Sequence, residues 1–385
     1  METTELIEII SRGEDSNHQF KENITNINSL AAEIVAFSNS NGGKLLVGVA
    51  DSNEVTGLSS DDIGRLNQLL SNAASQSVRP PINPETENIS HPNGLVMVIS
   101  IPAGVSKPYM DNNGAIWVKS GADKRKVTSR EEIQRMFQTA GLIHGDEIPA
   151  NGITVSDIDN DYFSKFFKRE YKEDIEAQEI PLPQLLENMN LAKSSALNIA
   201  GALLFSQRPQ FRLPIFIVKA VCYPGNDRNG EDYLDSKDIT GKIADIFQQT
   251  ISFIITNLRH EQGDKTVNST GEPVVARIVF EELIANALIH RDYFISAPIR
   301  IFVFSNRIEI VSPGHLPNNL TIENIKSGNS NIRNPILASF ATKILPYRGI
   351  GSGIINALRA HPDIDFIDDK ENNLFKAIIL IEKKT

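Results

Sequence analysis

The spacing of apolar residues in the first part of the chain predicts a region in which helices and strands alternate. Apolar residues recur at helical spacing in four segments, at 4–11, 30–37, 60–75 and 129–140. Short apolar or alternating runs predict strands at 44–51, 95–101 and 115–119. The Asn41-Gly42-Gly43 sequence supplies a stop signal after the second helix. We therefore expect an α+β fold here.

The middle of the chain follows a stretch, 141–154, whose glycine and proline residues favour turns over packed elements. Beyond it, the patterns predict helices at 161–170, 183–188 and 239–258. They also predict one strongly β-prone run, at 212–223. None of these segments carries a phosphate-binding or acid–base motif. The sequence therefore assigns no chemistry to the middle of the chain.

The last region opens with a long helix at 273–293, because its apolar residues follow a 3.6-residue period. Two strands are predicted after it, at 298–305 and 307–313, followed by two helices at 333–345 and 354–361. A closing hairpin is predicted at 365–383. A glycine loop, RGIGSG, separates the two helices. This order of elements predicts an α/β sandwich with one face of its sheet covered by helices.

The length of 385 residues exceeds what one hydrophobic core usually serves, so we expect several domains. Hydrophobic residues make up 41% of the chain and charged residues 22%, which is typical of globular proteins. The patterns divide the chain at two places, into domains at 1–142, 150–268 and 269–385. The predicted fold class is α+β, with several domains.

Cysteine and charge limit the possible functions. The single cysteine, Cys222, excludes an internal disulfide or a site with several cysteine ligands, and is typical of a reducing compartment. The N-terminus lacks a secretory pattern and no apolar run is long enough for a membrane span, so we expect a cytoplasmic protein without a membrane partner. The net charge of −10 means that any nucleic-acid binding must depend on a local basic patch.

Three polar residues in the long C-terminal helix form a candidate site. Glu282, Asn286 and His290 are four residues apart, so they share one helix face beside apolar positions. A carboxylate can orient an attacking water, and an amide oxygen suits Mg²⁺. Ordinary hydrogen bonding at a helix surface is the alternative interpretation.

The glycine loop is a second candidate feature. Gly349, Gly351 and Gly353 follow Arg348 and precede a helical segment, so backbone N–H groups at that helix start could bind phosphate. A flexible connection would have the same composition. The loop does not fit the Walker pattern or the dinucleotide fingerprint.

These two features together resemble the GHKL (Bergerat-fold) ATPases, in the divergent branch of RecG-like C-terminal ATPase domains. The resemblance lies in EELIANALIHRDY, IEIVSPGHLP, RNPIL and RGIGSGI, which span most of 274–381. It implies ATP and Mg²⁺ as cofactors, Glu282 as the catalytic residue that activates water, and Asn286 as the metal ligand. The nucleotide-binding residues expected from it are Asn286, His290, Arg291, Ser312, Gly314, Arg348, Gly349, Gly351 and Gly353.

The sequence departs from the family at the adenine-binding motif. Where D-x-G-x-G is expected, this chain has Ser312-Pro313-Gly314-His315-Leu316, without the aspartate and the second glycine. The divergent branch commonly has this form. The fold expectation therefore stands, while the identity of the base stays open.

The N-terminal region resembles the Schlafen, AlbA-like (divergent AAA-4) domain over roughly 6–140. The residues that carry the resemblance are Gly13-Glu14, Gln19-Phe20-Lys21, AFSNSNGGKLLVGVAD and VTGL. In nucleolytic members of that family two glutamates and an aspartate form an acidic triad. Glu14 and Asp51 match two of its positions, but Gln19 stands at the third. The resemblance therefore favours nucleic-acid binding over cleavage.

A basic run provides the expected nucleic-acid contacts in this region. The candidates are Lys21 together with Lys119, Lys124, Arg125 and Lys126, followed by Arg130. A solvated turn would show the same residues, and capping or turn roles would equally explain Glu14, Lys21 and Asp51.

Three functions are consistent with the sequence. The first is an ATP-binding protein, with slow hydrolysis, that couples nucleotide to nucleic-acid binding or regulation. The second is a metal-dependent RNA or DNA endonuclease, and the third is a DNA-binding transcriptional regulator without enzymatic activity. The expected partners are nucleotide, DNA or RNA through the N-terminal domain, and further copies of the chain in a homo-oligomer.

Overall fold

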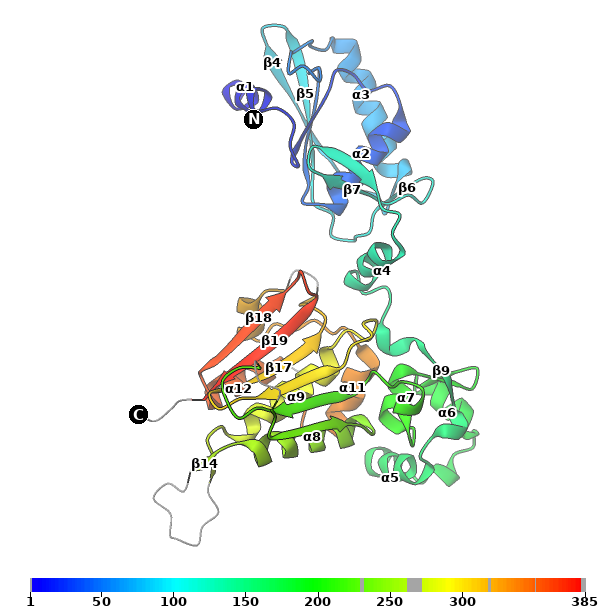
Figure 1. Ribbon diagram of the computed structural model, residues 1–385. Helices are drawn as coiled ribbons and strands as arrows, with labels where there is room; N and C mark the ends of the chain where they lie inside the picture. The colour runs from blue at the N-terminus through cyan, green and yellow to red at the C-terminus, as the bar shows by residue number, and fades with distance from the viewer. Residues whose placement is uncertain (1, 229–231, 262–271, 318–319, 350, 382–385) are drawn as a thin grey trace. The chain divides into compact units, whose positions relative to one another are not determined.

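The chain forms two compact units, Met1–Leu142 and Ile143–Thr385, which are described separately. The computed structural model describes residues 2–228, 232–261, 272–317, 320–349 and 351–381 (Figure 1). The units are called the N-terminal unit and the C-terminal unit below.

The N-terminal unit is built on a four-stranded sheet with the order β1-β2-β5-β4. Its strands are β1 (His18–Lys21), β2 (Gly43–Val47), β5 (Gly94–Ile101) and β4 (Glu85–His91). The β1–β2 pair is parallel and the other two pairs are antiparallel. Short strands complete the unit as β3 (Val78–Arg79), β6 (Met110–Asp111), β7 (Trp117–Ser120) and β8 (Asp123–Lys126).

Both faces of this sheet are buried, because alternate residues of a strand point to opposite sides. Leu45 and Val47 of β2 pack with α2 (Ile27–Asn39) and α3 (Ser60–Asn72). Leu46 points the other way and packs with α1 (Thr3–Arg12). The last helix of the unit is α4 (Arg130–Thr139). The sheet thus fixes β1, which carries Gln19 and Lys21, and the end of β2, after which Asp51 lies.

The C-terminal unit is built on a six-stranded sheet with the order β13-β12-β16-β17-β19-β18. Its strands are β12 (Val218–Cys222), β13 (Asp235–Ile239), β16 (Ile299–Val303), β17 (Arg307–Pro313), β18 (Ile364–Asp369) and β19 (Leu374–Leu380). Only the β12–β16 pair is parallel among these strands.

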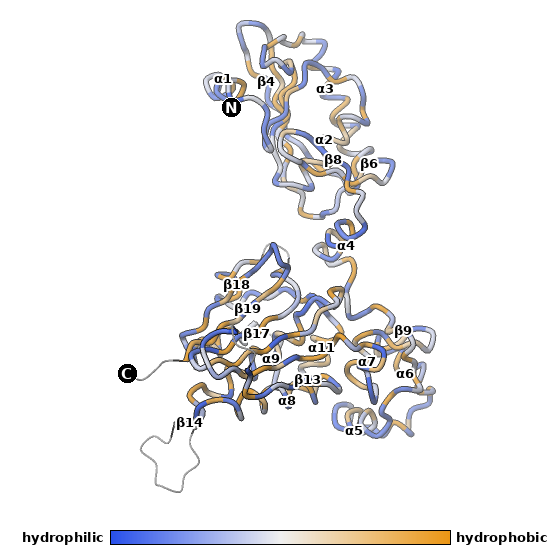
Figure 2. Tube along the Cα trace, in the orientation of Figure 1, coloured by the Kyte–Doolittle hydropathy of each residue, from blue (hydrophilic) through white to orange (hydrophobic). Residues whose placement is uncertain are grey.

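Helices cover one face of this sheet. They are α8 (Ile243–Asn257), α9 (Arg277–His290), α10 (Ile322–Lys326), α11 (Pro335–Ile344) and α12 (Ser352–Ala360). Ile308 and Ile310 of β17 belong to the core shared with α9, whereas Val311 packs in a small cluster with Phe302 and Phe304. Figure 2 shows apolar segments along the sheet and along these helices. Helix α9 is therefore held between the sheet and its neighbouring helices.

A smaller layer precedes the sheet in the same unit. It consists of the strands β9 (Pro149–Thr154), β10 (Ala192–Lys193) and β11 (Ala196–Asn198) and the helices α5 (Asn160–Tyr171), α6 (Leu182–Asn188) and α7 (Ile199–Phe205). The short strands β14 (His260–Glu261) and β15 (Glu272–Pro273) pair with each other. One core joins this layer to the sheet, because Phe205 packs 5.7 Å from Phe340 of α11.

The mixed α/β fold with several domains expected from the sequence is confirmed. The boundary expected at 268/269 lies outside the described residues, and β12, from the expected middle domain, pairs with β16 from the expected last domain. The run at 212–223 forms a strand only over Val218–Cys222, and the helix expected from 239 begins at Ile243 because Ile239 ends β13. Strand β4 was not predicted, because only one of its seven residues is buried.

Within the described ranges, every helix is too short or too polar to cross a lipid bilayer.

Replacing Phe205 by alanine should destabilise the C-terminal unit as a whole. The side chain is fully buried and lies 5.0 Å from the Phe163 ring and 4.9 Å from the Phe166 ring. Loss of a buried aromatic ring costs about 3–5 kcal/mol. We expect a loss of this size in the free energy of unfolding measured with urea. Phe211→Ala, at a side chain that is 76% exposed, is the control and should cost less than about 1 kcal/mol.

Candidate functional site

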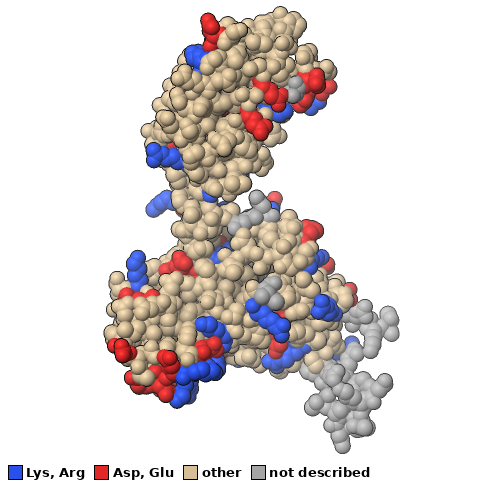
Figure 3. Space-filling view, turned by 180° about the vertical axis from the view of Figure 1, so that it is seen from behind, with Lys and Arg blue, Asp and Glu red and all other residues tan. Residues whose placement is uncertain are grey.

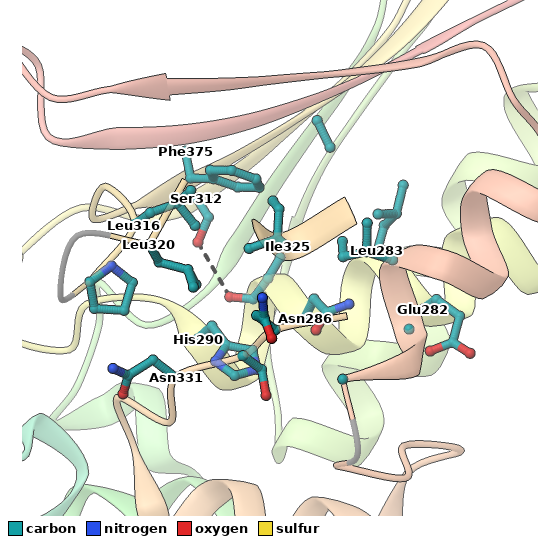
Figure 4. A pocket seen from close by; sticks show the side chains of 18 of the residues that line it. Glu282, Leu283, Asn286, His290, Ser312, Leu316, Leu320, Ile325, Asn331 and Phe375 are labelled. Atoms are coloured by element: carbon teal, nitrogen blue, oxygen red, sulfur yellow. Dashed lines mark hydrogen bonds between the residues drawn. The ribbon is translucent and has the colours of Figure 1, made fainter. Parts of the chain in front are cut away.

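The candidate site in the C-terminal unit is a pocket between α9, the end of β17 and the start of α12. Its described lining includes nearly every residue proposed from the sequence, namely Glu282, Asn286, His290, Ser312, Gly314, Arg348, Gly349, Gly351 and Gly353. The pocket contains about 1010 Å³ of space, counted out to its open mouth. Figure 4 shows Glu282 at one end and Ser312, Leu316 and Leu320 at the other. A pocket that has a polar and an apolar end suits a small-molecule ligand with the same two kinds of group.

Glu282 is held at the polar end of the pocket by α12. Its side chain is only 8% exposed, and its Oε1 accepts a hydrogen bond of 2.9 Å from Asn356 Nδ2. Because Asn356 lies in the first turn and a half of α12, the carboxylate ties this helix to α9. Glu282 is therefore oriented before any ligand binds.

Asn286 lies one helical turn from Glu282 and is incompletely hydrogen-bonded. Its Nδ2 is buried and has no hydrogen-bond partner among the described residues. A Cβ atom added to Gly353 would lie 3.0 Å from this Nδ2 and 2.8 Å from Glu282 Oε2. Because Gly353 has no Cβ, the backbone of α12 lies close to both side chains, and a larger residue would displace their polar ends. An unpaired buried amide is costly, which points to a ligand as its partner.

The N-terminus of α12 faces the same end of the pocket. Its N-cap residue, Gly351, adopts the left-handed conformation (φ 75°) and provides no side-chain cap. A Cβ at Gly351 would lie 2.0 Å from the carbonyl oxygen of Gly328, so this position also requires glycine. Gly349 has a φ of 70°, and Arg348 is exposed at the pocket lining. Ile350, within the predicted loop, lies outside the described residues.

His290 connects the end of α9 to the segment before the glycine loop. Its Nε2 lies 3.1 Å from the Tyr347 hydroxyl oxygen, and the ring also hydrogen-bonds to the backbone of Asn331. Burial, together with the positive charge of Arg333, lowers the pKa of His290 to about 4. The imidazole is therefore neutral at pH 7. Sequence reasoning did not find Tyr347, whose only signal is its position next to Arg348.

Ser312 lies at the opposite, apolar end. Its side chain is 6% exposed, and its hydroxyl donates a hydrogen bond of 3.3 Å to the Ala287 carbonyl oxygen (Figure 4). The apolar side chains that line the pocket are Leu283, Ala287, Ile310, Leu316, Pro317, Leu320, Ile325, Ile354, Phe375 and Ala377. This end is suited to a flat apolar group such as a nucleobase.

Gly314, in the pocket lining, allows the half-buried Arg333 to pack against its backbone. Its φ is 101°, and a Cβ there would lie 2.3 Å from Arg333 Nη1 and 2.7 Å from the Asp292 Cβ. Arg333 donates to the His315 carbonyl oxygen at 2.7 Å and thereby fixes the strand exit after Ser312. Gly314 thus shapes the site through its backbone, and Arg333 was not predicted.

The expectation that Arg291 contacts nucleotide differs from the observed position of its side chain. The guanidinium group lies between the rings of Phe216 and Tyr293, at 4.7 and 4.9 Å from their centroids. It donates to the carbonyl oxygens of Ile295 and Ala297 at 3.1 and 2.8 Å. Helix α9 ends at His290, so the next side chain leaves the pocket-facing stripe. Arg291 stabilises the following loop and does not line the pocket.

The residues around Asn286 could hold the expected metal ion only if the ion arrives bound to the ligand. The described residues contain no group of three His, Cys, Asp or Glu side chains that could hold a metal. Mg²⁺ usually takes one or two protein ligands and completes its shell with phosphate oxygens and water. The Glu282 carboxylate and the Asn286 amide oxygen provide such a pair.

In the N-terminal unit, the structure brings Glu14, Gln19 and Lys119 together. Gln19 Nε2 donates to Glu14 Oε1 at 2.6 Å, and Lys119 Nζ donates to Gln19 Oε1 at 2.6 Å. Glu14 Oε1 also accepts from the Phe20 N–H, and Lys119 Nζ also donates to the Ala122 carbonyl oxygen. The Gln19 amide therefore links a carboxylate to an ammonium group.

Two more residues of the basic run are engaged in ion pairs. Lys124 Nζ lies 2.5 Å from Glu33 Oε1, and Arg125 pairs with Glu132 at 2.6 Å. Glu33 is 3% exposed within α2 and was not predicted, because its position lies among apolar residues. These contacts reduce the charge that the run presents to a nucleic acid.

The remaining predicted residues lie outside this network of hydrogen bonds. Lys126 is exposed at the end of β8, and Lys21 is half-buried at the end of β1. Asp51 is exposed in a turn after β2, and no described hydrogen bond joins it to Glu14 or Gln19. On the face of the molecule shown in Figure 3, acidic and basic side chains are interspersed.

Comparison with known families places two domains in the chain. Residues 14–128 match the family model described as "Schlafen, AlbA_2", and residues 296–371 match the one described as "Putative ATP-dependent DNA helicase recG C-terminal". Both family resemblances recognised in the sequence are confirmed. The second match contains Ser312 and the glycine loop and begins after α9. Comparison with curated proteins gave no match.

Two solved structures are similar to this chain. The DIP2311 protein from Corynebacterium diphtheriae is 18% identical, with 99% of this chain and 80% of that chain covered and a TM-score of 0.47. The N-terminal domain of a RecG-related protein from Nitrosomonas europaea is 20% identical, with 34% of this chain and 96% of that chain covered and a TM-score of 0.24.

Lowering the pH should destabilise the C-terminal unit through His290. The folded pKa is about 4 and the ordinary value is 6.5, so below about pH 6.5 the unfolded chain binds a proton that the folded chain does not. Stability is therefore lost as the pH falls from about 6.5 to about 4. We expect the free energy of unfolding of the wild type, minus that of His290→Gln, to fall by on the order of 2 kcal/mol between pH 7.5 and pH 5.

The difference between the two proteins isolates His290 from other titrating groups. Burial raises the pKa of Asp146 to about 6, which acts in the opposite direction, but both proteins carry this residue. A difference that stays constant across this pH range would contradict the assignment of a neutral imidazole.

Proposed function

We propose that this chain binds a nucleoside triphosphate in the C-terminal pocket and couples that binding to nucleic-acid recognition by its N-terminal unit. The observation that carries the proposal is the buried Nδ2 of Asn286, which has no hydrogen-bond partner in the described part of the chain, beside the N-terminus of α12, which has no side-chain cap. The family match to an ATPase-like domain supports it.

In this proposal the phosphates bind at the polar end. The first N–H groups of α12 have no intrahelical acceptors, and the helix dipole favours negative charge there. The Asn286 amide provides a further donor, and Arg348 adds a positive charge. Gly353 keeps Cβ atoms out of the space between these groups. Together they offer donors to a triphosphate without a Walker-type loop.

Glu282 and the amide oxygen of Asn286 would hold a Mg²⁺ ion that arrives with the nucleotide. Such an ion neutralises phosphate charge and polarises the terminal phosphoryl group. Glu282 is also the candidate base for water, since it is a carboxylate oriented by Asn356 at the same end of the pocket. Because Asn356 belongs to α12, movement of this helix would change the orientation of the base. Slow hydrolysis is consistent with a base whose orientation depends on the position of α12.

Replacement of Asn286 by alanine should abolish nucleotide binding. A ligand at one hundred times its Kd stabilises the folded state by about 2.7 kcal/mol, which raises the Tm of a domain of this size by about 5 °C or more. We expect this shift for the wild type with ATP and Mg²⁺ in a thermal-shift assay, and a shift below about 1 °C for Asn286→Ala.

Asn188→Ala is the matched control, because Asn188 is exposed at the end of α6 and does not line the pocket. It should show the wild-type shift. If the wild type melts identically with and without nucleotide, the pocket does not bind nucleotide and the proposal fails.

Nucleic-acid binding by the N-terminal unit is the second part of the proposal. It rests on the Schlafen family match and on the exposed basic residue Lys126 at the end of β8. Cleavage by an endonuclease has less support, because Gln19 contributes no carboxylate and the described residues hold no cluster of three acidic groups. Action as a transcriptional regulator would need the same binding surface.

Replacement of Lys126 by alanine should weaken nucleic-acid binding in a salt-dependent way. Each phosphate contact contributes about 0.9 to the slope of log K against log salt concentration for a duplex. We expect filter binding with duplex DNA and with RNA to show a slope smaller by about 1 for Lys126→Ala. Lys237→Ala, at an exposed position of β13 in the other unit, should leave the slope unchanged. An equal slope for both variants would exclude Lys126 as a phosphate contact.

A further inference from the structure

The short 3₁₀ turn η5 (Pro209–Phe211) carries an exposed aromatic ring in the C-terminal unit. The Phe211 side chain is 76% exposed, whereas every other one of the 18 phenylalanines in the chain is buried or half-buried. Phenylalanine is among the residue types that are most often buried. A single exposed apolar side chain is nevertheless common on protein surfaces, so its surroundings decide whether it has a role.

The turn that presents this ring is fixed to the neighbouring backbone. Pro209 is buried at its first position and restricts the backbone angle φ. The Gln210 side chain donates to the carbonyl oxygens of Phe216 and Gly241 at 3.2 and 2.9 Å, and it accepts from the Gly241 N–H at 3.0 Å. The Phe211 ring is therefore presented from a fixed backbone, and little conformational entropy is lost when a ligand contacts it.

Two arginine side chains flank the ring. The Arg208 guanidinium carbon lies 5.3 Å from the centroid of the Phe211 ring, because residues three apart in a 3₁₀ turn lie on the same side. Arg212 packs against the backbone of Gly152, since a Cβ added there would lie 3.2 Å from the arginine Nε. Both arginines are exposed, and neither guanidinium group forms a hydrogen bond or an ion pair with a described residue. Their N–H donors are therefore available to an anion.

The sequence around this turn is free of acidic residues. Asp and Glu make up 48 of the 385 residues, yet the 39 residues from 188 to 226 contain neither. Asp157 lies beside the turn, because its carbonyl oxygen accepts from the Gln207 N–H at 3.0 Å. Its carboxylate, however, accepts from the Thr154 N–H at 2.7 Å and forms no ion pair with a described residue. The turn therefore presents local positive charge, although the whole chain is acidic.

A single-stranded nucleic acid makes use of all three side chains. A base can stack on the open face of the Phe211 ring, and phosphates on either side of that base can accept from the two guanidinium groups. A duplex keeps its bases stacked on each other and offers none to the ring. An acidic peptide would leave the ring unused, and an apolar protein surface would bury both guanidinium groups without acceptors.

From these contacts we propose that Phe211, Arg208 and Arg212 form a binding site for single-stranded nucleic acid. The ring stacks with one base, and the two arginines bind the flanking phosphates. The site belongs to the C-terminal unit and is additional to the recognition proposed for the N-terminal unit. It requires neither Lys126 nor a nucleotide in the pocket.

Photo-crosslinking of the full chain to a single-stranded oligonucleotide that carries 5-iodouracil tests the stacking directly. We expect the crosslinked peptide identified by mass spectrometry to contain Phe211, because an excited base couples to an aromatic ring stacked against it. The crosslink should be retained in Lys126→Ala and lost in Phe211→Leu. A chain that binds the oligonucleotide but gives crosslinks only at other positions overturns the proposal.

Fluorescence anisotropy measures the contribution of the ring to affinity. The probes are labelled single strands of DNA and RNA of about 12 nucleotides and a duplex of the same length, and the background is Lys126→Ala, which weakens binding by the N-terminal unit. Phe211→Ala and Phe211→Leu should each weaken single-strand binding by about 5- to 150-fold, and Phe211→Trp should stay within about threefold of the background. Duplex binding should change by less than about twofold. If Phe211→Leu binds a single strand as well as the background does, the contact is not stacking and the proposal is wrong.

The arginines are tested through the salt dependence of single-strand binding. Arg208→Gln and Arg212→Gln should each reduce the slope of log K against log salt concentration by about 0.7, which is the contribution of one phosphate of a single strand. Arg359→Gln, at an exposed position in the last turn of α12, is the matched control and should leave the slope unchanged. All these positions are exposed, so the variants should fold as the wild type does. Equal slopes for the three variants would exclude both arginines as phosphate contacts and overturn the site.

The two nucleic-acid sites can fail separately. If Lys126→Ala weakens binding and the Phe211 variants do not, the site at the turn fails alone. If the Phe211 variants weaken single-strand binding and Lys126→Ala has no effect, the N-terminal part of the proposed function fails and the site at the turn stands. If the full chain binds neither a single strand nor a duplex, both fail.

Discussion

The close contact between α9 and α12 at Gly353 determines what the C-terminal unit can do. A side chain at this position would displace the polar ends of Glu282 and Asn286, so glycine lets the helix N-terminus lie directly beside a carboxylate and an amide as they stand. The contact brings together the first N–H groups of α12, an Asn286 Nδ2 without a hydrogen-bond partner among the described residues, and an oriented carboxylate. Their hydrogen-bonding needs exceed what the protein itself supplies, and an anionic ligand meets them.

This contact depends on a sheet assembled from distant parts of the chain. Strands β12 and β13 extend the sheet beyond β16, and α8 packs against them and against α9. Helix α9 is therefore buried on nearly all sides, including Phe280 and Ile284 at no more than 1% exposure. A helix held this firmly cannot rotate to pair its polar stripe elsewhere. The fold thereby maintains the unsatisfied Asn286 amide, which in isolation would be unfavourable.

The sequence predicted those parts of the site that follow from local periodicity. Glu282, Asn286 and His290 lie four residues apart on one helix, and the glycine loop precedes another helix, so both features were visible without coordinates. The expectation for Arg291 came from the resemblance alone, and its side chain lies between Phe216 and Tyr293 rather than in the pocket lining. Tyr347 and Arg333 reach the site only through tertiary packing, which no local pattern encodes.

In the N-terminal unit, the sequence likewise did not reveal which basic side chains are paired in the fold. A run of basic residues predicts a nucleic-acid surface, yet Lys119 and Lys124 find partners in Gln19 and Glu33, which are distant in sequence. The amide at 19 is suited to this arrangement, since it donates to Glu14 while accepting from Lys119. A glutamate there would place a second negative charge against Glu14. The glutamine thus converts a potential acidic site into a neutral link, and the charge still available to a partner lies at the exposed end of β8.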